Sequence, residues 1–228
     1  MIIAERKPIE EILNMIGEAT SVLLAGCATC VADCMAGGER EVGILASALR
    51  IALTRKGKSA EILEATVERQ CEWEFVERIR ESVERADIVI STACGIGVQA
   101  MAERYDNKPI YPGVNTSFLG LREEEGLWVE RCAACGECTL HLTGGICPVA
   151  RCSKSLLNGP CGGSTEGKCE ISEETDCGWQ LIVDRLKALG QLERLETAIP
   201  PKNWAASRDG GPRKVIKKEL RVEKRKQP

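Results

Sequence analysis

The chain has 228 residues, of which 43% are hydrophobic and 29% are charged, and its net charge at pH 7 is −3. This length allows one large or two small folded domains with ordinary soluble composition. The negative charge and the aromatic content of 4% argue against a nucleic-acid binder. Because no apolar run approaches the roughly 20 residues of a membrane span or the core of a signal peptide, we expect a cytoplasmic protein without membrane insertion.

In chain order, predicted helices and strands alternate through the first half of the sequence. Helical apolar spacing predicts helices over residues 8–19, 38–57 and 73–85. Short apolar runs predict buried strands over residues 21–26, 60–67 and 86–93. This alternation is typical of an α/β fold, so we expect a small, doubly wound parallel sheet in a domain of residues 1–125.

The second half of the sequence has a different composition. Residues 126–199 are rich in glycine, cysteine and proline, so we expect an irregular, metal-stabilised domain that buries little apolar surface. Within it, residues 177–192 have the apolar spacing of a closing helix. Residues 200–228 are predicted to form a basic C-terminal tail, in which residues 212–228 carry eight basic and two acidic side chains.

Cysteine is the unusual residue of this sequence, with 13 copies against a single histidine. In a reducing cytosol, so many thiols indicate metal binding rather than disulfides. The shortage of histidine favours all-cysteine coordination, which means iron–sulfur clusters or structural zinc. Five cysteines lie within residues 27–94 and eight within residues 132–177, so the metal ligands also divide into two modules.

Cys27, Cys30 and Cys34 have C-x2-C-x3-C spacing and follow a predicted strand directly. A [4Fe–4S] cluster needs four ligands, so a fourth must come from elsewhere in the chain. Cys71 and Cys94 follow later strands, and the carboxyl ends of parallel strands meet at one edge of a sheet. We predict Cys94 as the fourth ligand and Cys71 as the alternative. Structural zinc, or a redox dithiol at the first two cysteines, is the competing interpretation.

Two glycines, Gly95 and Gly97, follow Cys94 immediately. A glycine lets the backbone approach a bound group closely, because it has no side chain. Hydrogen bonds from backbone N–H groups to cluster sulfides tune the reduction potential. We therefore predict that both glycines help to bind the first cluster.

The second motif, Cys132-Ala-Ala-Cys135-Gly-Glu-Cys138, has the C-x2-C-x2-C spacing that opens the bacterial ferredoxin motif. We predict a second [4Fe–4S] cluster here. Its fourth ligand is expected among Cys147, which precedes a proline, Cys152, Cys161 and Cys169. The cysteines left over, together with Cys177, either form a third site that holds a cluster or zinc, or are buried thiols.

This sequence resembles the MetV-type small iron–sulfur subunit of the two-subunit methylenetetrahydrofolate reductases of acetogens and related anaerobes. The resemblance rests on CAACGECTLHLTGGICPVARCSKSLLNGPCGGSTEGKCE, in which NGPCGG at residues 158–163 is the most specific part. The segments GCATCVADCMAGGEREVGILASALR and NWAASRDGGPRK resemble the family too. The resemblance therefore covers nearly the whole chain, and its domain family is that of the methylenetetrahydrofolate reductase C-terminal-like proteins.

The resemblance implies an electron-transfer subunit of one-carbon metabolism, in the reductive acetyl-CoA (Wood–Ljungdahl) pathway. Electrons would pass from ferredoxin or a larger redox partner, through [4Fe–4S] clusters, to the FMN of a TIM-barrel partner subunit. That partner carries the folate chemistry, so this chain would be a non-catalytic subunit of the oxidoreductase. The implied ligands are Cys27, Cys30, Cys34 and Cys94 for one cluster, and Cys132, Cys135 and Cys138 for another.

Two other functions also fit the residues. One is a docking or scaffold subunit that zinc stabilises and that has no redox role, because zinc has no redox chemistry. The other is a stand-alone corrinoid- or thiol-handling enzyme, which needs an exposed thiolate of low pKa. The metal content separates the docking subunit from the electron-transfer subunit, and alkylation of thiols identifies the enzyme.

Overall fold

The computed structural model describes residues 1–217 and 219. The chain divides into two compact units, Met1–Glu130 and Arg131–Pro228. The predicted basic tail, residues 200–228, falls in the second unit, and its residues 218 and 220–228 lie outside the described residues.

The first unit contains both strands and helices. Its strands are β1 (Ile2–Arg6), β2 (Ser21–Cys27), β3 (Glu61–Val67), β4 (Ile88–Ser91), β5 (Ile110–Pro112), β6 (Val114–Glu124) and β7 (Leu127–Cys132), the last of which ends just inside the second unit. Its helices are α1 (Ile9–Ile16), α2 (Cys30–Asp33), α3 (Glu39–Arg55), α4 (Trp73–Val76), α5 (Arg80–Arg85) and α6 (Gly95–Arg104), with a 3-10 turn over Glu77–Ile79 between α4 and α5.

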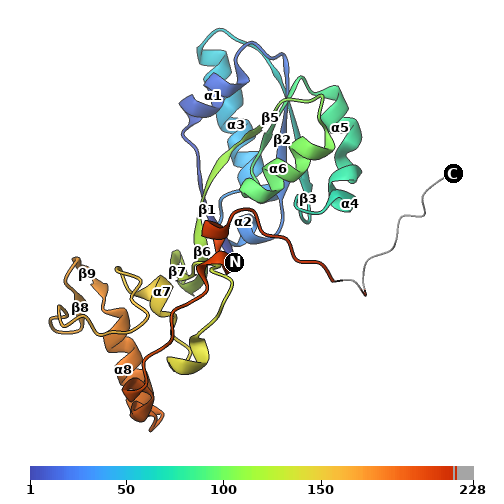
Figure 1. Cartoon of the computed structure of the whole chain (residues 1–228). Helices are drawn as coiled ribbons and strands as arrows, with labels where there is room; N and C mark the ends of the chain where they lie inside the picture. Colours follow the sequence, from blue (N-terminus) through green and yellow to red (C-terminus); the bar gives the residue numbers. More distant parts are fainter. Residues whose placement is uncertain (218, 220–228) are drawn as a thin grey trace. The chain divides into compact units, whose positions relative to one another are not determined.

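A four-stranded parallel sheet in the order β3-β2-β4-β5 forms the centre of the first unit. Helices α1 and α3 lie on one side of this sheet, and α4, α5 and α6 lie on the other (Figure 1). On the first side, Leu45 and Leu49 of α3 are buried against the sheet, four residues apart as a helix requires. Met101 of α6 is fully buried on the second side. The predicted α/β fold with a parallel sheet is therefore confirmed.

The predicted helix over residues 73–85 is not continuous. It consists of α4, the 3-10 turn over Glu77–Ile79, and α5. The tighter turn keeps Ile79 buried in the same apolar cluster as Val76 and Val83. Packing against the sheet thus decides where the regular helix is interrupted, and the apolar spacing alone does not show it.

A second sheet, which the sequence did not predict, consists of three strands in the order β1-β6-β7. Strand β1 pairs antiparallel with β6, so that Ile2 lies opposite Leu119 and Arg6 opposite Val114. Ile3 and Val114 are buried in one cluster with the cysteines that follow the parallel strands. The small sheet therefore packs on the carboxyl edge of the parallel sheet.

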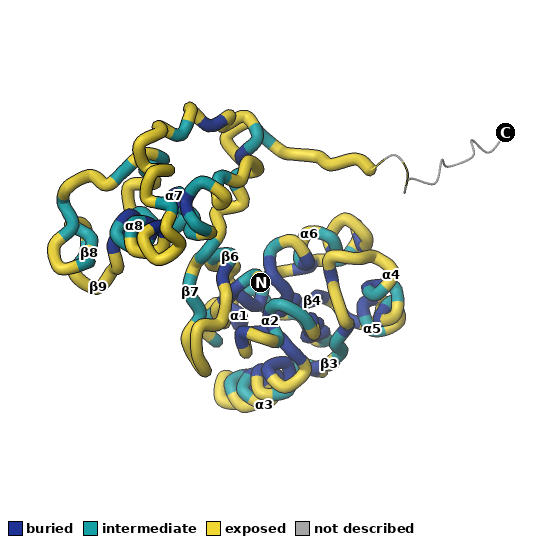
Figure 2. The backbone as a smooth tube through the Cα atoms, turned by 90° about the horizontal axis from the view of Figure 1, so that it is seen from below, coloured by how far each residue is buried: buried dark blue, intermediate teal, exposed yellow. Residues whose placement is uncertain are grey.

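The second unit has short elements and a small core. They are α7 (Pro148–Arg151), β8 (Lys168–Cys169), β9 (Ser172–Asp176) and α8 (Gly178–Ala188), with 3-10 turns over Leu140–Leu142, Leu192–Glu196, Trp204–Ala206 and Arg208–Gly210. The predicted closing helix is α8. Its buried residues Trp179, Ile182 and Leu186 form the core together with Cys177. Most of this unit is exposed, in contrast to strand β4 of the first unit, which is buried along its whole length (Figure 2).

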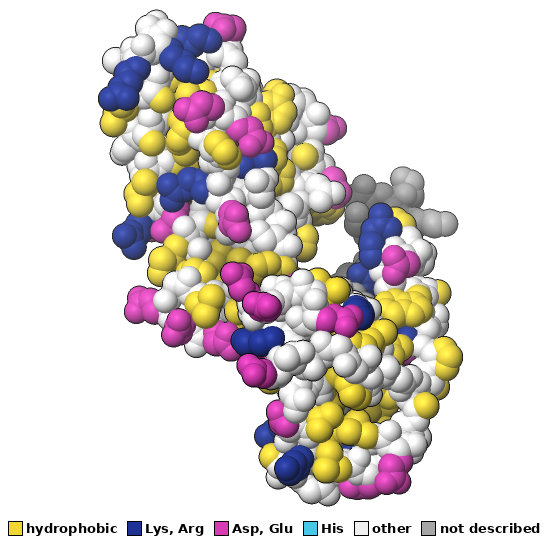
Figure 3. Space-filling view, turned by 90° about the vertical axis from the view of Figure 1, so that its left-hand side faces the viewer, with side chains coloured by type: hydrophobic (Ala, Val, Ile, Leu, Met, Phe, Trp, Pro, Cys, Tyr) yellow, Lys and Arg dark blue, Asp and Glu magenta, His cyan; other side chains and the backbone are white. Residues whose placement is uncertain are grey.

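Charged side chains of both signs are interspersed on the described surface that Figure 3 shows. Many form short-range ion pairs, such as that of Arg80 with Glu77 at 2.5 Å. Exposed pairs of this kind contribute little to stability. Among the described residues, no helix is long and apolar enough to cross a membrane.

Candidate metal centres

Cys27, Cys34 and Cys94 lie in one buried cluster at the carboxyl edge of the parallel sheet. Cys27 is the last residue of β2, and Cys94 is the N-cap residue of α6, directly after β4. The apolar side chains of Val31 and Ala36 are buried in the same cluster as the three thiols. This packing follows from the topology, since parallel strands end at the same edge.

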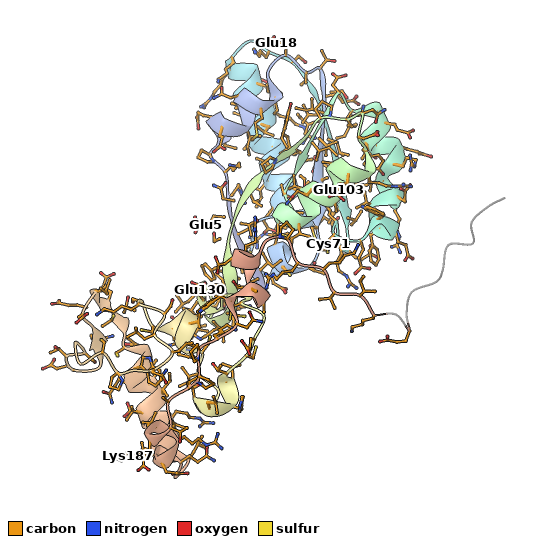
Figure 4. The ribbon with its side chains drawn as sticks, in the orientation of Figure 1. Glu5, Glu18, Cys71, Glu103, Glu130 and Lys187 are labelled. Atoms are coloured by element: carbon orange, nitrogen blue, oxygen red, sulfur yellow. The ribbon has the colours of Figure 1, made fainter. Side chains whose placement is uncertain are left out.

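The other two cysteines of the first unit lie close to this cluster. Cys30 begins α2 and is half-buried, whereas Cys71 is exposed in the loop after β3. Partial desolvation, and then the neighbouring thiols of Cys27 and Cys94, raise the pKa of Cys71. Burial raises the pKa of Cys34, and the nearby Cys30 adds to this shift. Figure 4 shows Cys71 at the end of the first unit at which α2 also lies.

The fully buried side chain of Gln70 joins the strand ends that carry these cysteines. Its Nε2 donates to the carbonyl oxygens of Ala25, at 2.8 Å, and Gly26, at 3.0 Å. Its Oε1 accepts from the hydroxyl of Ser91 at 2.6 Å. One amide thus fixes the end of β2, before Cys27, to the end of β4 and to the loop of Cys71.

The loop that carries Cys30 and Cys34 returns to the sheet at Gly37. The carbonyl of Gly37 accepts from the N–H of Cys27 at 3.0 Å and from the hydroxyl of Thr92 at 2.9 Å. A Cβ atom on Gly37 would lie 1.9 Å from the carbonyl oxygen of Thr92, so only glycine fits here. This close approach fixes the cysteine loop against the end of β4.

Both glycines of the predicted first site lie in the first turn of α6. The N–H of Gly95 donates to the hydroxyl of Thr116 at 2.8 Å. A Cβ atom on Gly97 would lie 2.9 Å from the Cβ of Gln70, so glycine permits α6 to pack against the Gln70 loop. Their hydrogen bonds to a cluster stay a prediction.

One buried donor near Cys34 suits a bound group that accepts hydrogen bonds. Trp128 and Cys34 line one cavity of about 480 Å³. The Nε1 of Trp128 is buried, with no acceptor among the described residues. A metal–thiolate centre supplies sulfur acceptors for such a donor. No three Cys, His, Asp or Glu side chains within the described part of the chain converge into an ion site.

The loop of residues 132–138 brings the second cysteine motif into a compact turn. Cys132 and Cys138 are exposed and Cys135 is half-buried. The N–H of Ala134 donates to the sulfur of Cys132 at 3.3 Å. Ala134 and Gly136 both have positive φ, at 50° and 86°, which turns the chain between successive cysteines. An N–H group directed at a cysteine sulfur is the arrangement that stabilises thiolate ligands.

The remaining cysteines occupy the ends of short elements and loops. Cys147 and Cys152 flank α7, and Cys161 is exposed in a loop. Cys177 is buried in the small core, and Cys152 packs against that core. The environment of Cys177 favours the buried-thiol interpretation, because free cysteine is among the most frequently buried residues.

Cys169 in β8 has the polar environment of a reactive thiol. Its sulfur lies 3.4 Å from the hydroxyl of Ser153. This hydrogen bond, then the backbone N–H groups of Ile171 and Ser172, and the charge of Lys154 lower the pKa of Cys169. The thiol-handling alternative needs an accessible thiolate of low pKa, and half-buried Cys169 is a candidate for it. The same lowered pKa suits a metal ligand.

We expect Cys169 to be alkylated at lower pH than other thiols of the reduced, metal-free chain. Its lowered pKa increases the thiolate fraction near pH 7, and the thiolate is the nucleophile. Iodoacetamide pulses between pH 6 and 9, followed by peptide mass spectrometry, measure this, with exposed Cys161 as the internal control. Ser153→Ala should move the profile of Cys169 to higher pH. Identical profiles for Cys169 and Cys161 would contradict the assignment.

Sequence reasoning identified the cysteines but not the polar groups that hold them. Gln70, Thr92 and Trp128 were missed. Gln70 and Thr92 bond to partners that are distant in the sequence, and the Nε1 of Trp128 has no partner among the described residues. The only local signal is the position of Gln70 directly before Cys71. A buried amide is not distinguishable from an exposed one by sequence pattern alone.

Comparison with known proteins gives one match. Residues 111–205 match the family model described as methylene-tetrahydrofolate reductase C terminal. The matched segment runs from β5 through the loop of residues 132–138 to the 3-10 turn over Trp204–Ala206. Neither the curated proteins nor the solved structures contain a match to this chain.

Proposed function

We propose that this chain is the iron–sulfur subunit of a methylenetetrahydrofolate reductase, because residues 111–205 match the family model described as methylene-tetrahydrofolate reductase C terminal. It would receive electrons from ferredoxin or a larger redox partner and pass them to the FMN of a TIM-barrel partner subunit. That partner would reduce the folate, in the reductive acetyl-CoA pathway of an anaerobe. The chain itself has an electron-transfer role and no catalytic residue in this proposal.

The observation that carries the proposal is the gathering of five cysteines at the carboxyl edge of one parallel sheet. Cys27, Cys30, Cys34 and Cys94 would hold one [4Fe–4S] cluster, and Cys132, Cys135 and Cys138 would hold a second with a fourth ligand from Cys147, Cys152, Cys161 or Cys169. When bound, such clusters supply one-electron transfer at potentials set by burial and hydrogen bonding.

The residues around the first site have defined tasks in this proposal. Gln70 and Gly37 fix the backbone that bears the cysteines. The apolar shell and the small antiparallel sheet shield the thiols of Cys27, Cys34 and Cys94 from water. The indole N–H of Trp128 is available to a sulfur acceptor. Together they would hold the ligands in place while an electron arrives or leaves.

Anaerobic purification of the full chain, with iron, sulfide and zinc measured per chain, tests the proposal. We expect about eight iron and eight sulfide per chain, and an EPR signal of reduced clusters after dithionite. About twelve of each would add a third cluster. Zinc with little iron would overturn electron transfer and support the alternative, a docking subunit that zinc stabilises.

Two single variants identify the fourth ligand of the first cluster. Cys94→Ala should remove about four iron per chain, because one ligand of a four-iron cluster is lost. Cys71→Ala is the matched control, since Cys71 follows a strand of the same sheet but is exposed. It should retain about eight. The reverse result would make Cys71 the ligand and Cys94 a buried thiol.

A further inference from the structure

A segment near the C-terminus lies across the loop of residues 132–138. This segment, residues 202–213, is called the strap below. The side chain of Lys202 is 0% exposed, and its Nζ lies 3.8 Å from the carboxylate of Glu137. The same Nζ donates to the carbonyl oxygen of Glu137. A buried ammonium group is therefore held against the residue between Cys135 and Cys138.

A second cation of the strap holds the other half of the same loop. Nη1 of Arg213 donates to the carbonyl oxygen of Ala134 at 2.6 Å. Between these two contacts the backbones meet directly, because a Cβ atom on Gly136 would lie 2.1 Å from the carbonyl oxygen of Ala206. The N–H of Asn203 also donates to the carboxylate of Glu137 at 2.8 Å. The strap thus contacts both of the two-residue segments that separate the three cysteines of the motif.

The strap has its own internal hydrogen bonds. The side chain of Asn203 accepts from the N–H of Ala205 at 3.1 Å and begins the 3-10 turn over Trp204–Ala206. The hydroxyl of Ser207 donates to the carbonyl of Trp204 at 2.7 Å and accepts from the N–H of Asp209 at 3.1 Å. This part of the predicted tail is therefore a folded element.

Burial of the Lys202 charge has a physical consequence. A buried ammonium group is costly unless anionic or strongly polar groups surround it. The carboxylate of Glu137 is half-exposed and lies at ion-pair distance only, so it compensates this charge in part. A metal centre with thiolate ligands from Cys135 and Cys138, which are two residues and one residue away from Glu137, is anionic and would complete the compensation.

We propose that the strap is a positioning element of the second metal centre, in which Lys202 places a fixed positive charge beside the loop of residues 132–138. The proposal rests on the proposed function for the nature of that centre. A positive charge stabilises the more negative, reduced form of a cluster and raises its reduction potential. Lys202 and Arg213 would also keep the loop in its ligand-bearing shape before metal binds.

The first test compares Lys202→Met with Lys214→Met in the full, reconstituted chain. Lys214 is an exposed lysine next to the strap and is the matched control. At a fixed potential, K202M should lower the reduced-to-oxidised ratio of one cluster about tenfold, which corresponds to about 59 mV for one electron. K214M should leave the ratio unchanged. An unchanged ratio in K202M, with both clusters present, would overturn the charge assignment.

The second test needs no iron and so separates this proposal from the proposed function. In the reduced, metal-free chain, we expect K202M and Arg213→Gln each to increase the alkylation rate of Cys132, Cys135 and Cys138 several-fold. Cys161 and the K214M variant serve as controls. Arg213 is exposed, so its replacement should not disturb folding. If the three cysteines are alkylated in R213Q at the wild-type rate, the strap does not hold the loop. Wild-type chain that binds no iron but shows the expected rates would overturn only the proposed function.

Discussion

Removal of metal is expected to lower the stability of the second unit strongly, while the parallel sheet of the first unit keeps its stability. Two apolar clusters, of thirteen and eleven buried residues, pack on the two sides of that sheet without any cysteine except at its edge. The cluster of the second unit has four buried residues, and one of them is Cys177. A core this small offsets only part of the conformational entropy of so long a segment, so bound metal supplies much of the stability of this unit.

Hydrogen exchange with mass spectrometry, on the chain before and after anaerobic chelation, measures this difference. Amides of α8 should exchange markedly faster after chelation, because that helix has only the small core to pack on. Amides of β2 should keep theirs, and they serve as the internal control. In the first unit we expect increased exchange only near Cys30 and Cys34. Full protection of α8 in the metal-free chain would show that the second unit needs no metal.

Gln70→Met is expected to lower the free energy of unfolding of the first unit by about 3 kcal/mol and to release the first cluster. Methionine has nearly the volume of glutamine but cannot donate to Ala25 and Gly26 or accept from Ser91. Each buried polar group that loses its partner costs about 1–3 kcal/mol. The strand ends that carry Cys27 and Cys94 would then separate.

Gln99→Met is the matched control for this substitution. The Nε2 of Gln99 also donates to a backbone carbonyl, that of Gly95, at 2.8 Å, but this hydrogen bond is exposed to solvent. We expect a change within about 0.5 kcal/mol and an unchanged iron content. Urea unfolding monitored by circular dichroism, with iron measured on the same samples, gives both quantities. Equal effects of the two substitutions would show that the Gln70 network does not hold the site.

The parallel sheet and its helices could be predicted from the sequence because their signals are local. The spacing of Leu45 and Leu49 repeats with the helical period, and the strands are short apolar runs that both sides of the sheet bury. Cys27 and Cys94 each follow such a strand, and parallel strands must end at one edge. Their proximity therefore followed from local pattern and topology together.

The antiparallel sheet and the strap depend on partners that lie far away in the chain. Strand β1 is defined by its pairing with β6, for example of Ile3 with Phe118. Its last two residues, Glu5 and Arg6, are both charged and exposed, so the strand lacks an alternating apolar pattern. The ammonium group of Lys202 bonds to a backbone carbonyl 65 residues earlier in the chain. From the sequence alone, a lysine in a basic segment is expected to be exposed.

The sequence alone therefore determined the elements of the parallel sheet and the residue type that marks the sites. Only the tertiary structure decided which polar groups hold those sites. Gln70 and Lys202 donate to backbone carbonyls that are distant in the sequence, and Trp128 lines a cavity. Apolar periodicity records which face of an element is buried. The hydrogen-bond partner of a buried polar group is known only once the chain has folded and distant segments have come together.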